Sequence, residues 1–353
     1  MSNQEEKTSF TSLDELGEFG LIDRLTEGLK FHDSSTQVGV GDDAAVINHD
    51  GYRTLVSTDL LVEGIHFDMV YTPLKHLGYK SAVVNFSDIY AMNGTPTQIV
   101  IGLAVSNRYS VEALDEFYSG LRLACENYGV DLVGGDTTSS KSGMMISITV
   151  IGKAKEEDIV YRSGAKPNDL LCVSGDLGGA YMGLLILERE KAEYLANPKM
   201  QPQLKGLDYI LQRQLRPEAR KDIVEIFREE GIKPTSMIDI SDGLASEILH
   251  LCKASGTGCQ LYEEKIPLDP LTVKTSKEFQ IVPSVAALSG GEDYELLFTV
   301  DQKDYEKITH HAADISIIGY MTADKGKAEM ITPDKHVIAL KAQGWDHYKK
   351  DES

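Results

Sequence analysis

One pattern recurs along this chain: an apolar run is followed or interrupted by glycine, serine or threonine and then by an acidic residue. Six stretches carry it: GDDAA at 41–45, STD at 57–59, FSD at 86–88, GGDTT at 134–138, DISDG at 239–243 and GGEDYE at 290–295. A single aspartate in such a place is usually a turn residue or a helix cap. The ends of buried strands, however, tend to meet at one rim of a sheet, where several carboxylates would repel one another. The repeated pattern therefore predicts a site at which cations lie between acids.

Strand-like and helix-like stretches alternate without strict order, which favours an α+β fold over a doubly wound sheet. The expected helices cover residues 12–31, 74–92, 110–128, 178–190, about 204–230 and 244–256. The expected strands cover 36–40, 44–48, 54–57, 97–106, 130–135, 144–154, 170–175 and 236–240, with mixed strands and turns beyond residue 256. A charged connector at 153–169 predicts a domain boundary near residue 157, between an N-terminal domain (1–156) and a C-terminal domain (157–353).

Two of the expected strands are apolar on both faces. They read TQIVIGLAVS at 97–106 and MMISITVIG at 144–152. Such strands need cover on each side, from helices or from another subunit. Because the first half has too few expected helices for both faces, we expect its sheet to pair with that of a second copy in a homodimer.

The composition excludes several classes of protein. A formal net charge of −20 argues against binding to duplex nucleic acid and against attraction to anionic membranes. The apolar runs are shorter than the ~18 residues of a membrane span, and the polar start MSNQEEKTSF is unlike a signal peptide. The four cysteines form no C-x-x-C pair and are typical of buried thiols in a reducing compartment. We therefore expect a cytoplasmic protein.

The stretch GVGDDA at 39–44 matches the G-x-G-x-x-A dinucleotide fingerprint, but that motif requires a helix to open at its second glycine. Here two aspartates occupy the place of the pyrophosphate, and the run AVI that follows is typical of a strand.

The hydroxyls of Ser57, Thr58 and Ser241 beside the acids make an oxygen-only set, which favours Mg²⁺ where phosphates complete its shell. Since the chain carries neither a Walker A lysine motif nor the protein-kinase motifs, we expect metal ions to hold a polyphosphate.

Eight motifs stand in one order over nearly the whole chain: GEFGLIDRL, GVGDDAAV, STDLLVEGIHF, NFSDIYAMNGTP, VGGDTT, RSGAKPND, IDISDGL and LSGGEDYELLF. In these motifs the chain resembles the thiamine-monophosphate kinases of the aminoimidazole-ribonucleotide-synthetase-like superfamily. Selenophosphate synthetases carry a reactive cysteine or selenocysteine near the N-terminus, whereas the first cysteine here is Cys125. Hydrogenase-maturation relatives end in a cysteine, whereas the last one here is Cys259. The aminoimidazole ribonucleotide synthetases proper differ around the first aspartate motif.

The resemblance implies transfer of the ATP γ-phosphoryl group to thiamine monophosphate, giving thiamine diphosphate and ADP, by a two-domain α+β protein with a dimerising sheet. The Mg²⁺ ligands that it implies are Asp43, Ser57, Thr58, Asp59, Asp88, Asp136 and Asp239, with Asp242 on a further ion. The ATP contacts that it implies are Tyr118, Gly135, Asp136, Arg162 and Ser241. The thiamine contacts would be His66, Glu292 and Trp345, and the catalytic residues Asp59, Asp88 and Arg162. Asp176, in SGDLGGA at 174–180, stands where relatives vary, and we assign it no role.

Apart from the resemblance, three of these residues have simpler interpretations. His66 would be an ordinary surface or core histidine, Arg162 a solvated charge and Trp345 a packing residue. The acceptor phosphate, with a second pKa of about 6, is largely dianionic at neutral pH and requires no general base. The residues leave open two alternatives: another ATP-dependent synthetase of the superfamily, and a non-catalytic nucleotide–Mg²⁺ sensor.

Overall fold

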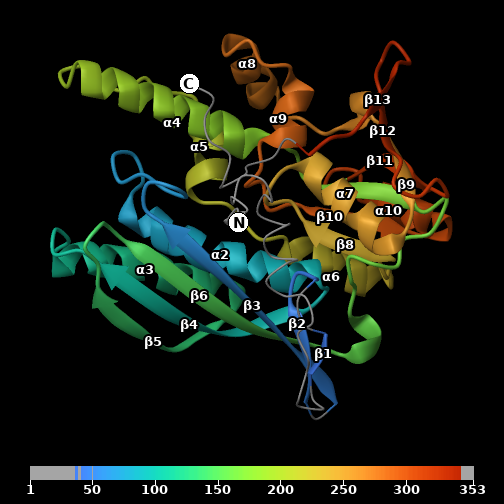
Figure 1. Ribbon diagram of the computed structural model, residues 1–353, viewed down its shortest axis with the longest axis horizontal. Coiled ribbons are helices and arrows are strands. Elements are labelled where there is room, and N and C mark those ends of the chain that lie inside the picture. Colours follow the sequence, from blue (N-terminus) through green and yellow to red (C-terminus); the bar gives the residue numbers. More distant parts are fainter. Residues whose placement is uncertain (1–35, 39–40, 50, 343–353) are drawn as a thin grey trace, which may run out of the picture.

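The computed structural model describes residues 36–38, 41–49 and 51–342. Two mixed β-sheets with their helices lie beside each other along the long axis of the molecule (Figure 1). The expected α+β class is confirmed. The expected helix at 12–31 lies outside the described residues. Among the described residues, no helix has the length and apolarity that crossing a membrane requires.

The first sheet has six strands in the order β1-β2-β3-β6-β4-β5. They are β1 Thr36–Val38, β2 Ala45–His49, β3 Tyr52–Val62, β4 Thr95–Val105, β5 Asp131–Ser139 and β6 Met145–Ala154. Neighbouring strands in this sheet are antiparallel, except β4 and β5, which are parallel. The long strand β3 therefore runs beside β6 through the middle of the sheet and carries the STD motif into the interior of the molecule.

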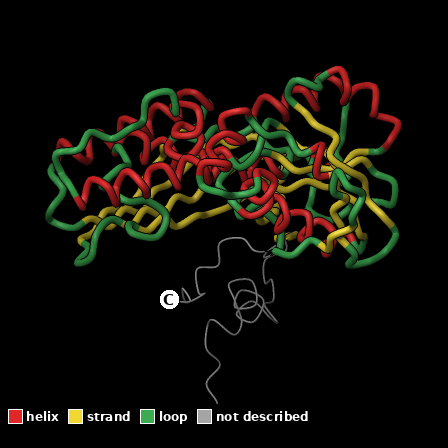
Figure 2. Tube along the Cα trace, turned by 90° about the horizontal axis from the view of Figure 1, so that it is seen from above, coloured by secondary structure: helices red, strands yellow, loops and turns green. Residues whose placement is uncertain are grey.

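Two helices, α2 (Leu74–Ala91) and α3 (Val111–Tyr128), cover one face of this sheet (Figure 2). They cross closely, because Gly78 and Gly120 each lack a side chain at the crossing: a Cβ on Gly120 would lie 1.7 Å from the carbonyl oxygen of Lys75. Helix α2 is buried along most of its length. It can therefore carry polar residues such as Asp88 against the second sheet.

The opposite face of the first sheet has no helix over it in the described part of the chain (Figure 2). Side chains alternate between the faces with the strand period of two. Ile146, Ile148 and Val150 of β6 are fully buried, whereas Met145 is 42% exposed. The register places Met145, Leu60 and Val100 on the same outer face, and the last two are 50% and 36% exposed. The two strands expected to be apolar on both faces thus leave one apolar face uncovered.

The second sheet has seven strands in the order β13-β12-β9-β11-β7-β10-β8. They are β7 Leu170–Ser174, β8 Ser236–Asp239, β9 Gly258–Tyr262, β10 Leu296–Val300, β11 Ile315–Thr322, β12 Ala328–Ile331 and β13 Val337–Ala339. Only β9 and β12 pair in parallel among these described strands. The helices of this half are α4 Gly179–Ala196, α5 Asp208–Leu215, α6 Lys221–Glu230, α7 Leu244–Ser255, α8 Pro270–Glu278, α9 Pro283–Ser289 and α10 Tyr305–His310.

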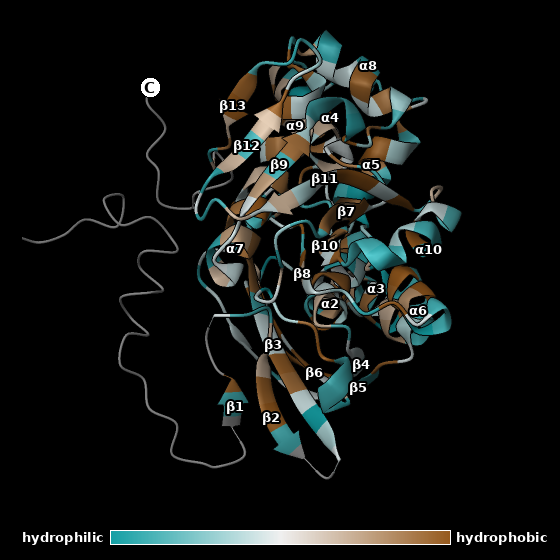
Figure 3. Cartoon of the chain, turned by 90° about the vertical axis from the view of Figure 1, so that its right-hand side faces the viewer, coloured by the Kyte–Doolittle hydropathy of each residue, from teal (hydrophilic) through white to brown (hydrophobic). Residues whose placement is uncertain are grey.

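Both faces of the second sheet are covered. Successive residues of β10 belong to different hydrophobic cores, since Phe298 packs in the core shared with the first sheet and Leu297 in the core under α7. Helix α6 carries both hydrophilic and hydrophobic residues (Figure 3), and its Phe227 ring lies 4.9 Å from that of Phe298. The end of β8, with Asp239, is held in this rigid setting and faces α2.

Two expectations about helices were wrong. The region 204–230 is two helices, because Pro217 has no N–H and disfavours a helical conformation at the preceding residue. Helices α8, α9 and α10 lie where mixed strands and turns were expected. The first two open with Pro270 and Pro283 in the first helical turn, where proline is favoured. The four cysteines are free and buried, as expected.

Candidate functional site

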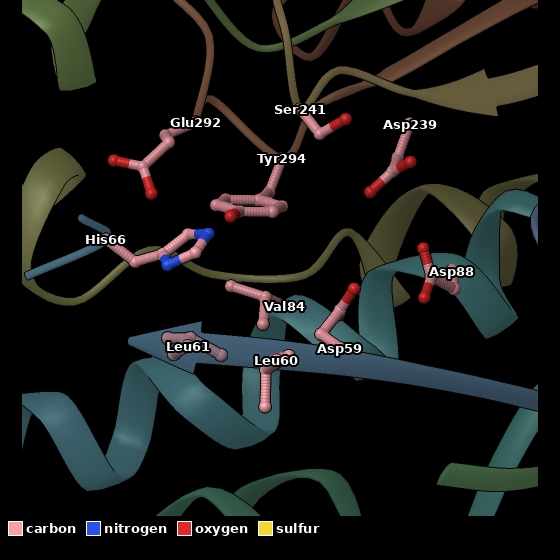
Figure 4. Close-up of a pocket in the computed structure, with 10 residues that line it drawn as sticks. All are labelled: Asp59, Leu60, Leu61, His66, Val84, Asp88, Asp239, Ser241, Glu292 and Tyr294. Carbon is pink, nitrogen blue, oxygen red and sulfur yellow. The ribbon is translucent and has the colours of Figure 1, made fainter. Parts of the chain in front are cut away.

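A cavity of about 140 Å³ lies between the two halves of the chain (Figure 4). The first half contributes residues of β3, the loop after it and α2, and the second half contributes the ends of β8 and the loop before β10. The lining residues are Asp59, Leu60, Leu61, His66, Val84, Asp88, Asp239, Ser241, Glu292 and Tyr294. Three of the six acidic motifs therefore line one cavity through their acids Asp59, Asp88 and Asp239, and a fourth through Glu292.

Three acids from distant parts of the sequence form a cluster beside this cavity. Asp43, Asp88 and Asp239 each place a carboxylate oxygen within 4.8 Å of the others. Burial raises the pKa of Asp88 well above its usual range, and the charges of Asp59, Asp239 and Asp43 raise it further. Burial together with Asp43 raises the pKa of Asp239 to about 7, and burial raises that of Asp59 to about 6. The predicted crowding of carboxylates is present.

Neighbouring polar side chains fix the direction of these acids. The hydroxyl of Ser57 donates to Asp88 Oδ2 at 2.6 Å, and that of Ser87 donates to Asp239 Oδ2 at 2.6 Å. The backbone N–H of Asp59 donates to Asn85 Oδ1 at 3.1 Å. Each hydroxyl occupies one carboxylate oxygen and leaves the other oxygen for a further partner. Ser57 thus orients an acid in this structure.

Arg162, in the connector between the two sheets, makes a bidentate pair with Asp43. Its Nε and Nη2 donate to Asp43 Oδ2 and Oδ1, both at 2.9 Å. Its backbone N–H also donates to Asp42 Oδ1 at 3.2 Å. Asp43 is therefore compensated by a cation, whereas no lysine or arginine among the described residues forms an ion pair with Asp59, Asp88 or Asp239.

The cavity has a second end, formed by His66 and Glu292, with Tyr294 between this end and the acids (Figure 4). Glu292 Oε1 pairs with Lys80 Nζ at 3.0 Å, and its Oε2 accepts from Gln214 Nε2 at 2.7 Å. His66 Nδ1 accepts from the backbone N–H of Val62 at 3.0 Å, so the neutral imidazole carries its proton on Nε2. This end presents a paired carboxylate and a ring N–H to the cavity.

The backbone of the GGEDYE motif is unusual. Glu292 and Tyr294 have φ values of +57° and +52°, which side chains other than glycine seldom adopt. Their backbone N–H groups donate to the carbonyl oxygens of Ser241 and Ile240 at 2.7 and 2.9 Å. This conformation directs both side chains into the cavity, and such strain is typical of functional sites.

Tyr294 and Lys80 are site residues that sequence reasoning missed. Tyr294 lies in the GGEDYE motif, and its place in that motif could have identified it as a site residue. Lys80 stands in a helix of mainly apolar residues, where no local pattern marks it.

Several expected site residues lie away from the cavity. Thr58 is on the outer face of the first sheet, where its hydroxyl donates to the carbonyl oxygen of Ile148 at 2.9 Å. Asp136 is exposed on β5 and pairs with Gly102 in the register, which places it on the same outer face. Tyr118 is on α3 and packs edge-on against Phe117.

The remaining expected residues are placed as follows. A Cβ at Gly135 would lie 2.2 Å from the carbonyl oxygen of Ile101, so sheet packing alone requires glycine there. Asp242 follows Ser241 in the turn before α7, and its backbone N–H donates to Glu247 Oε1 at 2.9 Å. Trp345 lies outside the described residues.

Residues 41–154 match the family model of the AIR synthase related protein, N-terminal domain, which defines the class of the first half. The chain is 33% identical over 342 residues to a thiamine-monophosphate kinase of Bacillus subtilis, covering 95% of this chain and 100% of the relative. It is 34% identical over 336 residues to that of Aquifex aeolicus, with 95% and 99% covered. The chain belongs to the thiamine-monophosphate kinase family, and the resemblance seen in its motifs is confirmed.

A solved structure supports the same assignment. It is described as AaThiL complexed with AMPPCP and TMP, and it superimposes with a TM-score of 0.80 at 32% identity. The match covers 96% of this chain and 100% of that one. The structural similarity therefore extends over both halves of the chain and their relative arrangement.

Proposed function

We propose that this chain transfers the γ-phosphoryl group of ATP to thiamine monophosphate, giving thiamine diphosphate and ADP, in the cavity between its two halves. The observation that carries the proposal is the cluster of Asp43, Asp88 and Asp239 at one end of a cavity whose other end offers Glu292 and His66. A site of this form can hold charged phosphates at one end and an organic cation at the other. The relative that was solved with AMPPCP, an ATP analogue, and TMP supports this reading.

The donor set fits Mg²⁺. The ligands are all oxygen. Burial raises the pKa values of Asp59, Asp88 and Asp239, and neighbouring carboxylates raise those of Asp88 and Asp239 further. The residues that we propose to hold the ions are Asp43, Ser57, Thr58, Asp59, Asp88, Asp136 and Asp239, with Asp242 on a further ion. Bound there, Mg²⁺ would supply the positive charge that phosphate oxygens require.

The chain itself contributes position and charge. The acceptor phosphate, with a second pKa of about 6, is largely dianionic and needs no base, so the main obstacle is repulsion between two anions. Ser57 and Ser87 orient Asp88 and Asp239, and Arg162 holds Asp43 with two hydrogen bonds. Asp43 and Asp239 are buried between the two halves, which strengthens electrostatic interactions at this end of the cavity. Catalysis on this proposal is positioning and electrostatic stabilisation.

The two substrates take different parts of the site. We propose that Tyr118, Gly135, Asp136, Arg162 and Ser241 contact ATP, and that His66, Glu292 and Trp345 contact the thiamine part. Asp59, Asp88 and Arg162 are the residues that we propose to act on the transferred group. The Glu292 carboxylate suits both the thiazolium cation and the amino group of the pyrimidine ring.

We also infer a homodimer of cytoplasmic chains, each of two domains at 1–156 and 157–353. The uncovered apolar face of the first sheet supports the dimer. Thr58 and Asp136 lie on that face, so their part in the site depends on the partner. The four free, buried cysteines support a reducing compartment.

One incubation tests the activity: protein, ATP, Mg²⁺ and thiamine monophosphate, with thiamine diphosphate quantified over time. Parallel incubations omit Mg²⁺ or the acceptor, and we expect no product in either. Binding of ATP without any turnover would favour a nucleotide sensor. ADP formation only with another phosphate or amide acceptor would favour a different synthetase.

A further inference from the structure

Lys80 is a buried cation whose partners among the described residues all lie in the other half of the chain. It is 3% exposed in the middle of α2. Its ammonium pairs with Glu292 Oε1 at 3.0 Å and donates to the carbonyl oxygen of Gln214 at 3.0 Å. A buried ammonium is costly unless it is paired and hydrogen-bonded. The position of Lys80 therefore depends on the second half, and the position of Glu292 depends on Lys80.

Glu292 receives one fixed donor on each oxygen. Lys80 occupies Oε1, and the amide of Gln214 donates to Oε2 at 2.7 Å. The side chain remains 30% exposed, and Figure 4 shows it directed into the cavity. A carboxylate oxygen accepts more than one hydrogen bond, so each oxygen keeps capacity for a donor of the substrate.

Lys80 also lines a second cavity, of about 10 Å³, on the other side of His66. This volume is close to that of one water molecule. Gln214 lines the same space, and its side-chain Oε1 is buried without a hydrogen-bond partner. Lys80 and Gln214 thus support Glu292 from outside the lining of the main cavity, and His66 lines both spaces.

The charge at Lys80 matters because the cavity is acidic. Asp59, Asp88 and Asp239 face it without an ion-pair partner among the described residues, and they lie at the end away from Glu292 (Figure 4). Without Lys80, Glu292 would be a further carboxylate without an ion pair, held only by the amide of Gln214. It would then be freer to turn toward any cation bound at the acid cluster.

We propose that Lys80 is a positioning residue for the acceptor substrate: it holds the Glu292 carboxylate at the thiamine end of the cavity and keeps it away from the metal end. This inference rests on the proposed function. Lys80 contacts the substrate only through Glu292, so its removal affects binding of the acceptor and leaves binding of ATP unchanged.

The test replaces Lys80 with methionine, which keeps an unbranched side chain one atom shorter and removes its charge. We expect Lys80→Met to raise KM for thiamine monophosphate about 10-fold or more, the loss of a well-placed charged hydrogen bond. KM for ATP and the Mg²⁺ dependence should stay within about twofold of the unchanged protein. Equilibrium dialysis of thiamine monophosphate without ATP should show the same loss, independent of turnover.

The matched control is Lys191→Met. Lys191 on α4 also pairs across the two halves, with Asp68 at 2.8 Å, but none of its ion-pair partners lines the main cavity. We expect its KM values to match those of the unchanged protein. An equal rise in KM for thiamine monophosphate in both lysine variants would overturn the inference, since any contact between the halves would then suffice.

A double-mutant cycle with Glu292→Gln separates positioning from general damage. If Lys80 acts through Glu292, then Lys80→Met adds little to KM once Glu292→Gln is present. The double variant also leaves no unpaired charge, so it should fold even where Lys80→Met alone does not. Additive effects on KM, or a rise in KM for ATP equal to that for thiamine monophosphate, would overturn the proposal. If the unchanged protein neither binds nor phosphorylates thiamine monophosphate, the proposed function falls and this inference with it.

Discussion

The guanidinium of Arg162 and the carboxylate of Asp43 share two hydrogen bonds of 2.9 Å, one to each carboxylate oxygen. Asp43 is 6% exposed, and Arg162 comes from the connector between the two sheets. The pair compensates Asp43 directly, whereas Asp88 and Asp239 form no ion pair among the described residues, although the Arg162 charge also lowers the pKa of Asp239. The pair therefore fixes the orientation of Asp43 at one side of the acid cluster.

The pair can be tested with Arg162→Lys, because lysine cannot make the planar two-point contact. We expect kcat to fall at least about 10-fold and the free energy of unfolding of the metal-free protein to fall by about 1.5–3 kcal/mol, the loss of one charged hydrogen bond. Arg228→Lys is the control. Arg228 also bridges the halves, through Gly94 and Thr95, away from the cavity. Equal losses in both variants would mean that Arg162 only joins the halves.

The acids can be separated by asparagine substitutions. Asp59→Asn and Asp88→Asn keep size and remove charge, so we expect kcat to fall about 100-fold or more while the Tm of the metal-free protein holds or rises. Asp136 is exposed on β5, so Asp136→Asn should lower activity without changing that Tm. Near-normal turnover of these variants across a Mg²⁺ titration would refute the assignment of metal ligands.

The raised pKa values predict how the metal-free protein responds to pH. Asp59 and Asp239 have pKa values of about 6 and about 7, above the ~4 of an unfolded aspartate. Between pH ~4 and ~7 the folded chain therefore binds more protons than the unfolded chain. The free energy of unfolding contributed by these groups thus falls as pH rises through this window.

The measurement is Tm against pH in a chelator and again in Mg²⁺. In the chelator, Asp239→Asn should have a smaller loss of Tm from pH 5 to 8 than the unchanged chain, because one of the groups responsible is gone. Mg²⁺ should raise Tm most near pH 8, where the acids are charged. The same dependence of Tm on pH with and without Mg²⁺ would contradict a metal site formed by these acids.

Much of the fold follows from local pattern. The expected helices at 74–92 and 110–128 and the strand at 97–106 agree with α2, α3 and β4 to within a residue or two. These segments are long and strongly periodic, which is where sequence patterns are most informative. The short helices α8 to α10 were missed because their apolar positions are few and tertiary contacts decide their conformation.

The site was predictable in kind but not in detail. Carboxylates after apolar runs predicted a cluster, and Asp43, Asp88 and Asp239 form one. The partners of the acids were not predictable, because Ser87 and Asp239, for example, are 152 residues apart. The motif STD also does not show which of its residues point to which face of the first sheet. The strand period places Asp59 toward α2 and Thr58 on the outer face.

Trp345 lies outside the described residues, and its role stays a prediction from sequence. The thiazolium ring of the substrate is a cation, and a tryptophan face binds such a cation with about 0.5–2 kcal/mol. Trp345→Ala should therefore raise KM for thiamine monophosphate about 3- to 30-fold and barely change KM for ATP, and Trp345→Phe should recover much of the loss. A lower Tm with equal effects on both substrates would instead identify Trp345 as a packing residue.

The uncovered face of the first sheet makes the dimer testable. Leu60, Val100 and Met145 expose apolar side chains on this face, and a surface of this kind usually marks an interface. We expect sedimentation at micromolar concentration to give a species of twice the 38.8 kDa chain. A single monomeric species would refute the dimer.

A charge on the face should disrupt the dimer, so we expect Val100→Arg to sediment as a monomer. Val111→Arg is the matched control, because Val111 is 71% exposed on α3, at the other face of the sheet, and this change should leave the dimer intact.

Thr58 and Asp136 lie on the same face as Val100, so their proposed contribution to the site requires the partner's sheet to cover that face. Monomeric Val100→Arg should therefore lose activity about as far as Asp136→Asn does, while its acid cluster, on the helix side of the sheet, still gains Tm on addition of Mg²⁺. Full activity in a monomeric Val100→Arg would show that a single chain holds the whole site, and Asp136 would then have no part in metal binding.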